Sequence, residues 1–189
     1  MGKEYTEISA ALQKWIERQH MFFVSTAPTA SGGLINCSPK GLDCLRVLGP
    51  LELAYADTGG SGIETLAHLK DNGRITLMMC AFEGPPRIYR FYGTGSPVEP
   101  HESSFDELAV EFEAMPAIRN FIVIQVERII DSCGFGVPMY SFEKHRDSLG
   151  NYFAKQSEED ILKYRRKHNS LSLEALEGLA PPLPGSASD

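Results

Sequence analysis

Short apolar and alternating runs follow one another along the middle of the chain, separated by turn residues and without regular helical crossovers. About seven runs have the β-branched and aromatic content of strands: residues 21–27, 34–38, 44–48, 51–56, 74–82, 87–94 and 121–130. Because parallel strands need a crossover of a dozen or more residues, this spacing favours antiparallel pairing. The pattern predicts a mainly β fold, with an antiparallel sheet that closes or nearly closes into a barrel, rather than a doubly wound sheet.

Helical patterns interrupt the strands and occupy both ends of the chain. Helices are predicted over residues 6–19, 61–73, 103–115, 157–168 and 172–177. Thr6 is the expected N-cap of the first helix. Ser61 and Glu64 fit the S-x-x-E capping box of the second, which Gly73 is expected to end. These peripheral helices are expected to flank the sheet rather than to separate parallel strands.

Composition indicates one ordinary globular domain. Of the 189 residues, 42% are hydrophobic and 23% are charged, which is typical of a soluble protein with a sizeable core. We expect a single domain over residues 1–179, with a helical arm from about residue 139. The segment 180–189 (APPLPGSASD) has the composition of a disordered tail.

Charge and cysteine content exclude several classes of protein. The 18 basic residues face 25 acidic ones, a net charge of −7, so neither nucleic acid nor an anionic membrane is an expected partner. No apolar run is long enough to span a bilayer, and the start of the chain lacks a signal-peptide pattern, so a cytoplasmic location is expected. Four cysteines without CxxC spacing are expected as reduced thiols. The scattered histidines indicate no metal site.

The segment LELAYADTGGSGIETL joins a strand to a helix through glycines 59, 60 and 62. A helix start offers unpaired N–H groups and the positive end of the helix dipole, and glycines let an anion approach closely. Ser61 and Thr65 add hydroxyl groups. The segment is therefore a candidate phosphate site, although an ordinary capped helix after a flexible turn is the commoner explanation of such a pattern. A dinucleotide-binding fingerprint is not indicated, because the third glycine and a parallel βαβ unit are lacking.

Two other strands carry polar side chains that suit an anion or an electron-rich ring. Asn36, Ser38 and Lys40 alternate onto one face of the strand that Pro39 ends. Arg87 and Arg90 lie on the later strand 87–94, three residues apart and therefore on opposite faces, so at most one of them faces a given pocket. Arginine suits a bidentate phosphate or carboxylate contact. A solvated strand end, or a surface ion pair, accounts for these residues if no ligand binds.

The loop SCGFGVP, residues 132–138, places Cys133 beside two glycines and an aromatic residue. No neighbouring residue gives a reason for a reactive thiol, and an inert cysteine is the commoner case. The G-x-S-x-G pattern of common serine hydrolases is absent from the sequence. No catalytic residue can be named from these patterns.

The order of these segments resembles the FMN-binding split-barrel proteins of the pyridoxamine 5′-phosphate oxidase-like superfamily. Four segments carry the resemblance: FFVSTAP, LINCSPKG, LAYADTGGSGIETLAHLKDNGRITLMM and RIYRFYGTG. It spans about residues 7–179. The resemblance implies a split β-barrel, a six-stranded antiparallel Greek-key-like barrel with flanking helices, and a homodimer with FMN at the interface.

By position, the resemblance implies a set of cofactor-binding residues: Asn36, Ser38, Lys40, Ser61, Thr65 and Arg90. The first three would line the flavin, and Ser61 and Thr65 would approach its phosphate. Arg90 would reach the phosphate or the ring. The loop from Cys133 to Pro138 is expected to cover the cofactor of the partner subunit.

Two features depart from the pattern of the oxidase itself. The oxidase typically has Ser-Arg-Lys at the start of the short helix, where Glu64 and Thr65 align in this chain. A cation for the phosphate must then come from Lys40 or from one of the two arginines near the later strand. The oxidase also has a C-terminal tryptophan and an Arg-x-His pattern, whereas the only tryptophan of this chain is Trp15. Vitamin B6 phosphate is therefore not the expected substrate.

Three functional hypotheses follow. The first is a flavin-dependent oxidoreductase of unknown substrate, in which FMN performs the redox step. The second is a non-catalytic carrier of FMN, haem or a deazaflavin, although haem would need an axial ligand that the sequence does not indicate. The third is a structural dimer whose glycine turn binds nothing.

Overall fold

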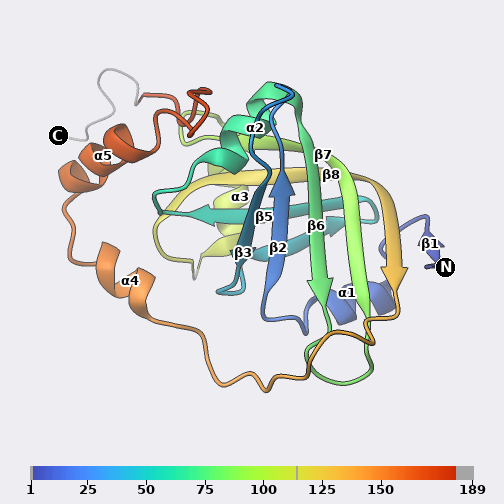
Figure 1. The fold of residues 1–189 in the computed structure, drawn as a ribbon. Helices are drawn as coiled ribbons and strands as arrows, with labels where there is room; N and C mark the ends of the chain where they lie inside the picture. Colours follow the sequence, from blue (N-terminus) through green and yellow to red (C-terminus); the bar gives the residue numbers. More distant parts are fainter. Residues whose placement is uncertain (1, 114, 182–189) are drawn as a thin grey trace.

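The computed structural model describes residues 2–113 and 115–181, and confirms a mainly β architecture with peripheral helices (Figure 1). The strands are β1 (Glu4–Tyr5), β2 (Phe22–Thr26), β3 (Asn36–Lys40), β4 (Leu45–Gly49), β5 (Glu52–Thr58), β6 (Arg74–Cys80), β7 (Ile88–Val98) and β8 (Ile118–Ser132). The helices are α1 (Ala10–Ile16), α2 (Glu64–Asn72), α3 (Ser104–Ala109), α4 (Ser148–Phe153) and α5 (Glu158–His168), with a 3-10 turn over Val110–Phe112. The predicted tail lies outside the described residues from 182 onward.

All strand pairs are antiparallel. Seven strands follow the order β3-β2-β6-β7-β8-β5-β4, and the short β1 pairs with β8. The described residues thus form an eight-stranded sheet, against the six strands expected for the barrel. The sheet curls so that β5 and β4 cross behind β2 and β6, with α2 at one end and α1 at the other (Figure 1).

The core fills the inside of the curled sheet. It combines buried aliphatic side chains with the fully buried rings of Tyr55, Phe91 and Phe121. Inward and outward residues alternate along β2 and β6, as expected for strands with one face on a core. Consecutive strands form two hairpins, since β2 pairs with β3 and β4 pairs with β5.

Two predicted helix starts are wrong. Helix α1 begins after Ser9 rather than Thr6, because residues 4–5 are already extended in β1, and the Ser9 hydroxyl accepts the Leu12 N–H at 3.3 Å. Helix α2 has Ile63 as its N-cap and no side-chain cap, so the Ser61–Glu64 capping box does not form. Gly73 does end α2, in the left-handed region at φ 72°.

The predicted helix over residues 172–177 is also wrong. Leu171 and Glu177 form an isolated antiparallel bridge, and Ala175 has a φ of 60°. The Ser172 hydroxyl accepts the N–H groups of Glu174 and Leu176, both at 3.2 Å. Serine here competes with the helix by offering the backbone a local turn.

Gly93 provides a direct test of the β7–β8 register. The register shifts between Tyr92 and Gly93, and a Cβ at Gly93 would lie 2.0 Å from the Gln125 carbonyl oxygen. Since backbone atoms must move to admit a methyl group, we expect Gly93→Ala to lower the free energy of unfolding by about 1–3 kcal/mol. Urea denaturation measures the change. Gly136→Ala, where a Cβ meets nothing within 4 Å, is the control, and equal effects would contradict the prediction.

Candidate functional site

A buried ion-pair cluster lies between β3, β5 and β8. The Asp57 side chain, 1% exposed, pairs with Lys40 at 2.7 Å and with Arg119 at 2.9 Å. Burial alone would raise the pKa of Asp57. The charges and hydrogen bonds of Lys40 and Arg119 outweigh that effect and hold the pKa below its ordinary value. The carboxylate therefore stays ionised and joins three strands.

Arg119 also fixes the glycine turn between β5 and α2. Its guanidinium donates to the Gly60 carbonyl at 3.0 Å and to the Gly62 carbonyl at 2.6 Å. Arg119 is the extra residue of a β-bulge, because Asp57 pairs with Asn120 and the next residue of β5 already pairs with Ile118. Bulges redirect side chains. Arg119 thereby points under the turn and holds its carbonyl oxygens from the inside.

The start of α2 leaves backbone donors available. The N–H groups of residues 60–63 donate to no protein acceptor within the part of the chain that the structure describes, and Ile63 provides no side-chain cap. The first N–H groups of a helix also lack intrahelical partners. A Cβ at Gly60 would meet nothing within 4 Å, and Ser61 is exposed. The turn therefore has a held inner side and an outer side that is open at Gly60, whereas at Gly62 a Cβ would lie 3.1 Å from a carboxylate oxygen of Glu64.

A hydrogen-bonded network joins β3 to α2 beside this turn. The Asn36 amide donates to Thr65 Oγ1 at 2.9 Å and to Thr26 Oγ1 at 3.2 Å. Ser38 Oγ donates to Asn36 Oδ1 at 3.1 Å. Thr26 Oγ1 lies 3.0 Å from Nδ1 of the fully buried His68. Since Thr26 already accepts from Asn36, its own hydroxyl hydrogen is free to donate to that ring nitrogen.

Five of the six predicted cofactor residues lie near one another. Asn36, Ser38 and Lys40 share one face of β3, as the alternation predicted, and the Asn36 amide reaches Thr65. Ser61 lies in the adjoining turn. Their role toward a cofactor stays a prediction.

Arg90 lies on the other face of the sheet. The strand registers connect Arg90 to β3 through a row of directly opposite residues. Arg90 is opposite Met78, Met78 is opposite Phe23, and Phe23 is opposite Pro39. Directly paired residues share a face, and Lys40, next to Pro39, points to the opposite one. Arg90 donates to Ser132 at 3.0 Å. Within one chain, the sheet separates Arg90 from the other predicted residues.

The three cations expected to serve a phosphate already have partners. Lys40 pairs with Asp57, and Arg87 pairs with Asp131 at 2.5 Å. Arg90 is bonded to a serine on the far face of the sheet. None of the three is therefore an unpartnered cation at the glycine turn.

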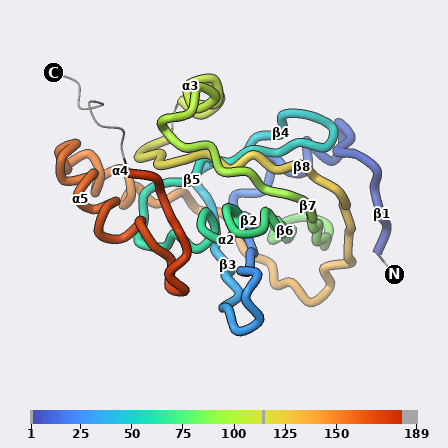
Figure 2. Tube along the Cα trace, turned by 90° about the horizontal axis from the view of Figure 1, so that it is seen from above, coloured from blue at the N-terminus to red at the C-terminus, as the bar shows by residue number. Residues whose placement is uncertain are grey.

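The C-terminal arm packs against the same turn (Figures 1 and 2). A Cβ at Gly59 would lie 2.3 Å from the ring of Phe153 in α4, so a side chain at this position would displace that ring. The buried Asn169, just after α5, donates to the Gly60 carbonyl at 2.9 Å. Glu174 accepts the Leu34 N–H at 3.0 Å and lies 3.6 Å from Nε2 of His68. The arm therefore holds the turn and the β2–β3 hairpin together.

Sequence patterns did not indicate the residues that organise the site, namely Asp57, Arg119, Thr26, His68 and Asn169. Asp57 and Arg119 are 62 positions apart, and only the β5–β8 register brings them together. Charged residues at the ends of two apolar runs were the one available signal.

Comparison with known proteins identifies the family of the chain. The family profile described as pyridoxamine 5′-phosphate oxidase matches residues 8–133. The chain belongs to the pyridoxamine 5′-phosphate oxidase family. The chain is 36% identical, over 193 residues, to the pyridoxamine 5′-phosphate oxidase family protein ustO of Aspergillus flavus, an alignment covering 93% of this chain and 77% of that relative.

Two solved structures share the fold of this family member. HupZ of Group A Streptococcus superimposes with a TM-score of 0.55 at 20% identity, covering 71% of this chain and 99% of HupZ. A putative pyridoxamine 5′-phosphate oxidase of Lactobacillus delbrueckii superimposes with a TM-score of 0.51 at 14% identity, covering 67% of this chain and 98% of that protein.

Among residues 2–113 and 115–181, no helix is both long and apolar enough to cross a membrane.

The Asp57 cluster should control stability. Removing its charge leaves Lys40 and Arg119 without their carboxylate, so we expect Asp57→Asn to lower the free energy of unfolding by about 3–5 kcal/mol. Asp43→Asn is the control, because Asp43 is 79% exposed where it pairs with Arg46, and its loss should cost below about 1 kcal/mol. Urea denaturation at neutral pH compares the two.

The same cluster predicts a pH dependence. Because the folded-state pKa of Asp57 lies below the ordinary value of about 3.9, its stabilisation is complete above that pH and is lost as pH falls through the folded pKa. Acid denaturation of the wild type should include this loss, and Asp57→Asn should lack it. An identical acid profile in both proteins would contradict the prediction.

Proposed function

We propose that this chain binds FMN, with the phosphate at the open side of the glycine turn, and acts as a flavin-dependent oxidoreductase. The observation that carries the proposal is the set of N–H groups over residues 60–63 that have no acceptor among the described residues, next to Thr65 and its partner Asn36. Membership of a family named for a flavin oxidase supports it. FMN is the predicted cofactor because the sequence resembles the FMN-binding split-barrel proteins.

The residues of the turn fit a phosphate in a particular way. Backbone N–H groups and hydroxyls at a helix start favour an anion, and Gly60 leaves room for close approach. The positive charge of Arg119 lies beneath the turn, paired with Asp57, rather than beside the anion. Affinity for the phosphate would therefore depend on charge-assisted hydrogen bonds from uncharged donors rather than on an ion pair.

Bound FMN would supply hydride or electron transfer at its ring. The residues of this chain would position the cofactor: Thr65 and the turn hold the phosphate end, and β3 carries Ser38 and Lys40 toward the other end. Asn36 and Lys40 are four residues apart on a strand, or about 13 Å at 3.3 Å per residue. The ion pair between Lys40 and Asp57 would place a fixed dipole beside the end of the cofactor that lies near Lys40.

One observation favours a non-catalytic carrier as the second candidate. Lys40 is the one titratable side chain on this face of β3, and its ammonium group is bound to Asp57. A proton donor or acceptor for turnover would then have to come from elsewhere. The cofactor of a carrier could be FMN, a deazaflavin or haem.

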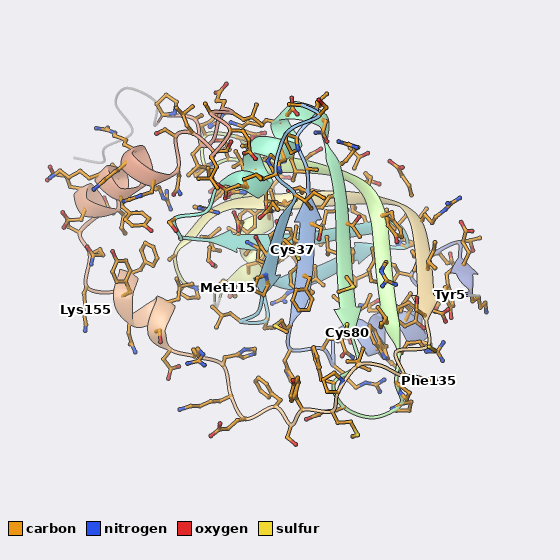
Figure 3. All side chains as sticks on the ribbon, in the orientation of Figure 1. Tyr5, Cys37, Cys80, Met115, Phe135 and Lys155 are labelled. Atoms are coloured by element: carbon orange, nitrogen blue, oxygen red, sulfur yellow. The ribbon has the colours of Figure 1, made fainter. Side chains whose placement is uncertain are left out.

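We also propose that a second copy of the chain completes the site. The β2–β3 hairpin and the segment after α5 lie side by side through the bond from Leu34 to Glu174. Both expose large apolar side chains: Leu34, Ile35, Leu171 and Leu173 are 59–79% exposed. An apolar cluster of this kind beside a ligand site is typical of a protein interface. Phe135, 81% exposed in the loop after β8, lies at the lower edge of the molecule, where a partner could meet it (Figure 3).

Absorbance spectroscopy of the purified protein tests the cofactor, and mass spectrometry of the released molecule identifies it. Flavin bands with FMN in the released fraction support the proposal, whereas a deazaflavin or haem spectrum supports the carrier with that cofactor. Reduction of the bound flavin by NAD(P)H and its reoxidation distinguish an enzyme from a carrier. A colourless protein that takes up no added FMN would reject the proposal.

Gly60→Ala tests the position of the phosphate. The added methyl group meets no protein atom, so the free energy of unfolding should not fall. If the phosphate lies against this backbone, the dissociation constant of FMN should rise about tenfold, equivalent to one charged hydrogen bond. The affinity for riboflavin, which lacks the phosphate, should stay unchanged. Gly32→Ala, also in open space, is the control, and unchanged FMN affinity in Gly60→Ala would place the phosphate elsewhere.

Ile35→Ser tests the subunit interface. The wild type should have twice the mass of the chain by light scattering, and the variant should dissociate because a 79% exposed apolar side chain is lost from the contact. FMN retention should fall with dissociation. Leu48→Ser, at a 37% exposed position on β4, should change neither property. A monomeric wild type that retains FMN would refute the shared site.

A further inference from the structure

A cavity of about 1350 Å³ lies at the α1 end of the sheet. Its walls come from α1, from the connection between β6 and β7, and from the linker between β8 and α4 (Figure 1). Of the six predicted cofactor residues, only Lys40 lines it. The cavity therefore lies at the end of β3 that is farther from the glycine turn. Its volume exceeds the roughly 300–1000 Å³ of ordinary small-molecule pockets.

Specific contacts hold the linker over this cavity. The Tyr140 N–H donates to the Phe82 carbonyl at 3.0 Å, and the Phe142 N–H donates to Glu83 at 2.8 Å. The rings of Phe142 and His20 stack with centroids 3.6 Å apart and planes 14° apart. These contacts join the linker to residues at the edge of the sheet that are more than 50 positions away in sequence. The linker is therefore a packed wall of the cavity.

The lining is rich in aromatic side chains. Trp15 packs edge-on against Tyr89 with centroids 4.7 Å apart, and Tyr5 lies 5.6 Å from Tyr89. His145 packs edge-on against Phe142 at 4.9 Å. Aromatic faces and edges of this kind favour contact with another planar ring.

The charged side chains of the lining determine which ligand charge the cavity favours. Lys40 and Arg87 line the cavity, but Asp57 and Asp131 neutralise them. Three further cations of the lining, Arg18, Lys144 and Arg146, take part in no ion pair with a described residue. Two carboxylates, Glu83 and Glu143, share the lining, and Glu83 accepts the Phe142 N–H. The lining thus has a surplus of positive charge in a chain whose net charge is −7.

We propose that this cavity binds a planar aromatic carboxylate. The aromatic walls would contact the ring, and the unpaired cations would attract the carboxylate. The cavity meets the end of β3 at which Lys40 lies, so such a compound would lie beside the proposed flavin. That this compound class is the substrate rests on the proposed function, whereas its binding does not.

The single tryptophan makes binding directly measurable, because Trp15 lines the cavity. The full-length protein is titrated with 2-naphthoate and with its neutral analogue 2-naphthamide. Calorimetry gives both affinities, and the indole N–H signal of Trp15 in a proton–nitrogen NMR spectrum reports the location. We expect 2-naphthoate to shift this signal and to bind about tenfold more tightly than the amide, as one charged hydrogen bond would give.

Variants separate charge from packing. Arg18→Gln combined with Arg146→Gln should weaken 2-naphthoate about tenfold, to the level of the amide, and leave the amide unchanged. Lys14→Gln combined with Arg166→Gln removes two exposed cations outside the cavity and should change neither affinity. Circular dichroism confirms that each variant is folded.

The possible outcomes are distinguishable. An unshifted Trp15 signal, or equal affinity for the two ligands, overturns the proposal. Displacement of 2-naphthoate by FMN also overturns it, because the cavity would then be the flavin site. A protein that binds 2-naphthoate at Trp15 but takes up no flavin supports the cavity and rejects the proposed function.

Discussion

The buried carboxylate of Asp57 requires two cations, and this requirement organises the surroundings of the glycine turn. Lys40 comes from β3 and Arg119 from a bulge in β8, so the ion pairs connect three strands that are distant in the chain. A buried charge that loses its partner costs several kcal/mol. Arg119 extends the same constraint to the turn by binding two of its carbonyl oxygens.

This arrangement explains how the turn differs from the pattern of the oxidase. The oxidase places cations at the start of the short helix, whereas this chain has Glu64 and Thr65 there. Its positive charge lies inside the sheet, balanced by Asp57, and the outer side of the turn offers neutral donors. Arg119 and Asn169 hold the carbonyl groups inward, which leaves the N–H groups without protein acceptors among the described residues. The C-terminal arm and the strands therefore shape the site together.

Local patterns predicted most of the strands because each one buries a continuous or alternating apolar face. They predicted the helix over residues 157–168, which the structure shows as α5 with Ser157 as its N-cap. They failed where distant contacts or short polar side chains decided the backbone. Ser172 replaces a helix with a turn, and the two-residue β1 forms only because β8 is beside it. Helix α4, which packs Phe153 on Gly59, had no such local signal.

The sequence by itself determined the antiparallel β class, the common face of Asn36, Ser38 and Lys40, and the position of the glycine turn between a strand and a helix. Periodicity and turn chemistry act over a few residues, so they can be recognised without knowing the fold. Only the tertiary structure decided that Lys40 is bound to Asp57, that Arg119 lies beneath the turn, and that Arg90 lies across the sheet. Those placements depend on strand register, in which a shift of one residue reverses the face of every side chain.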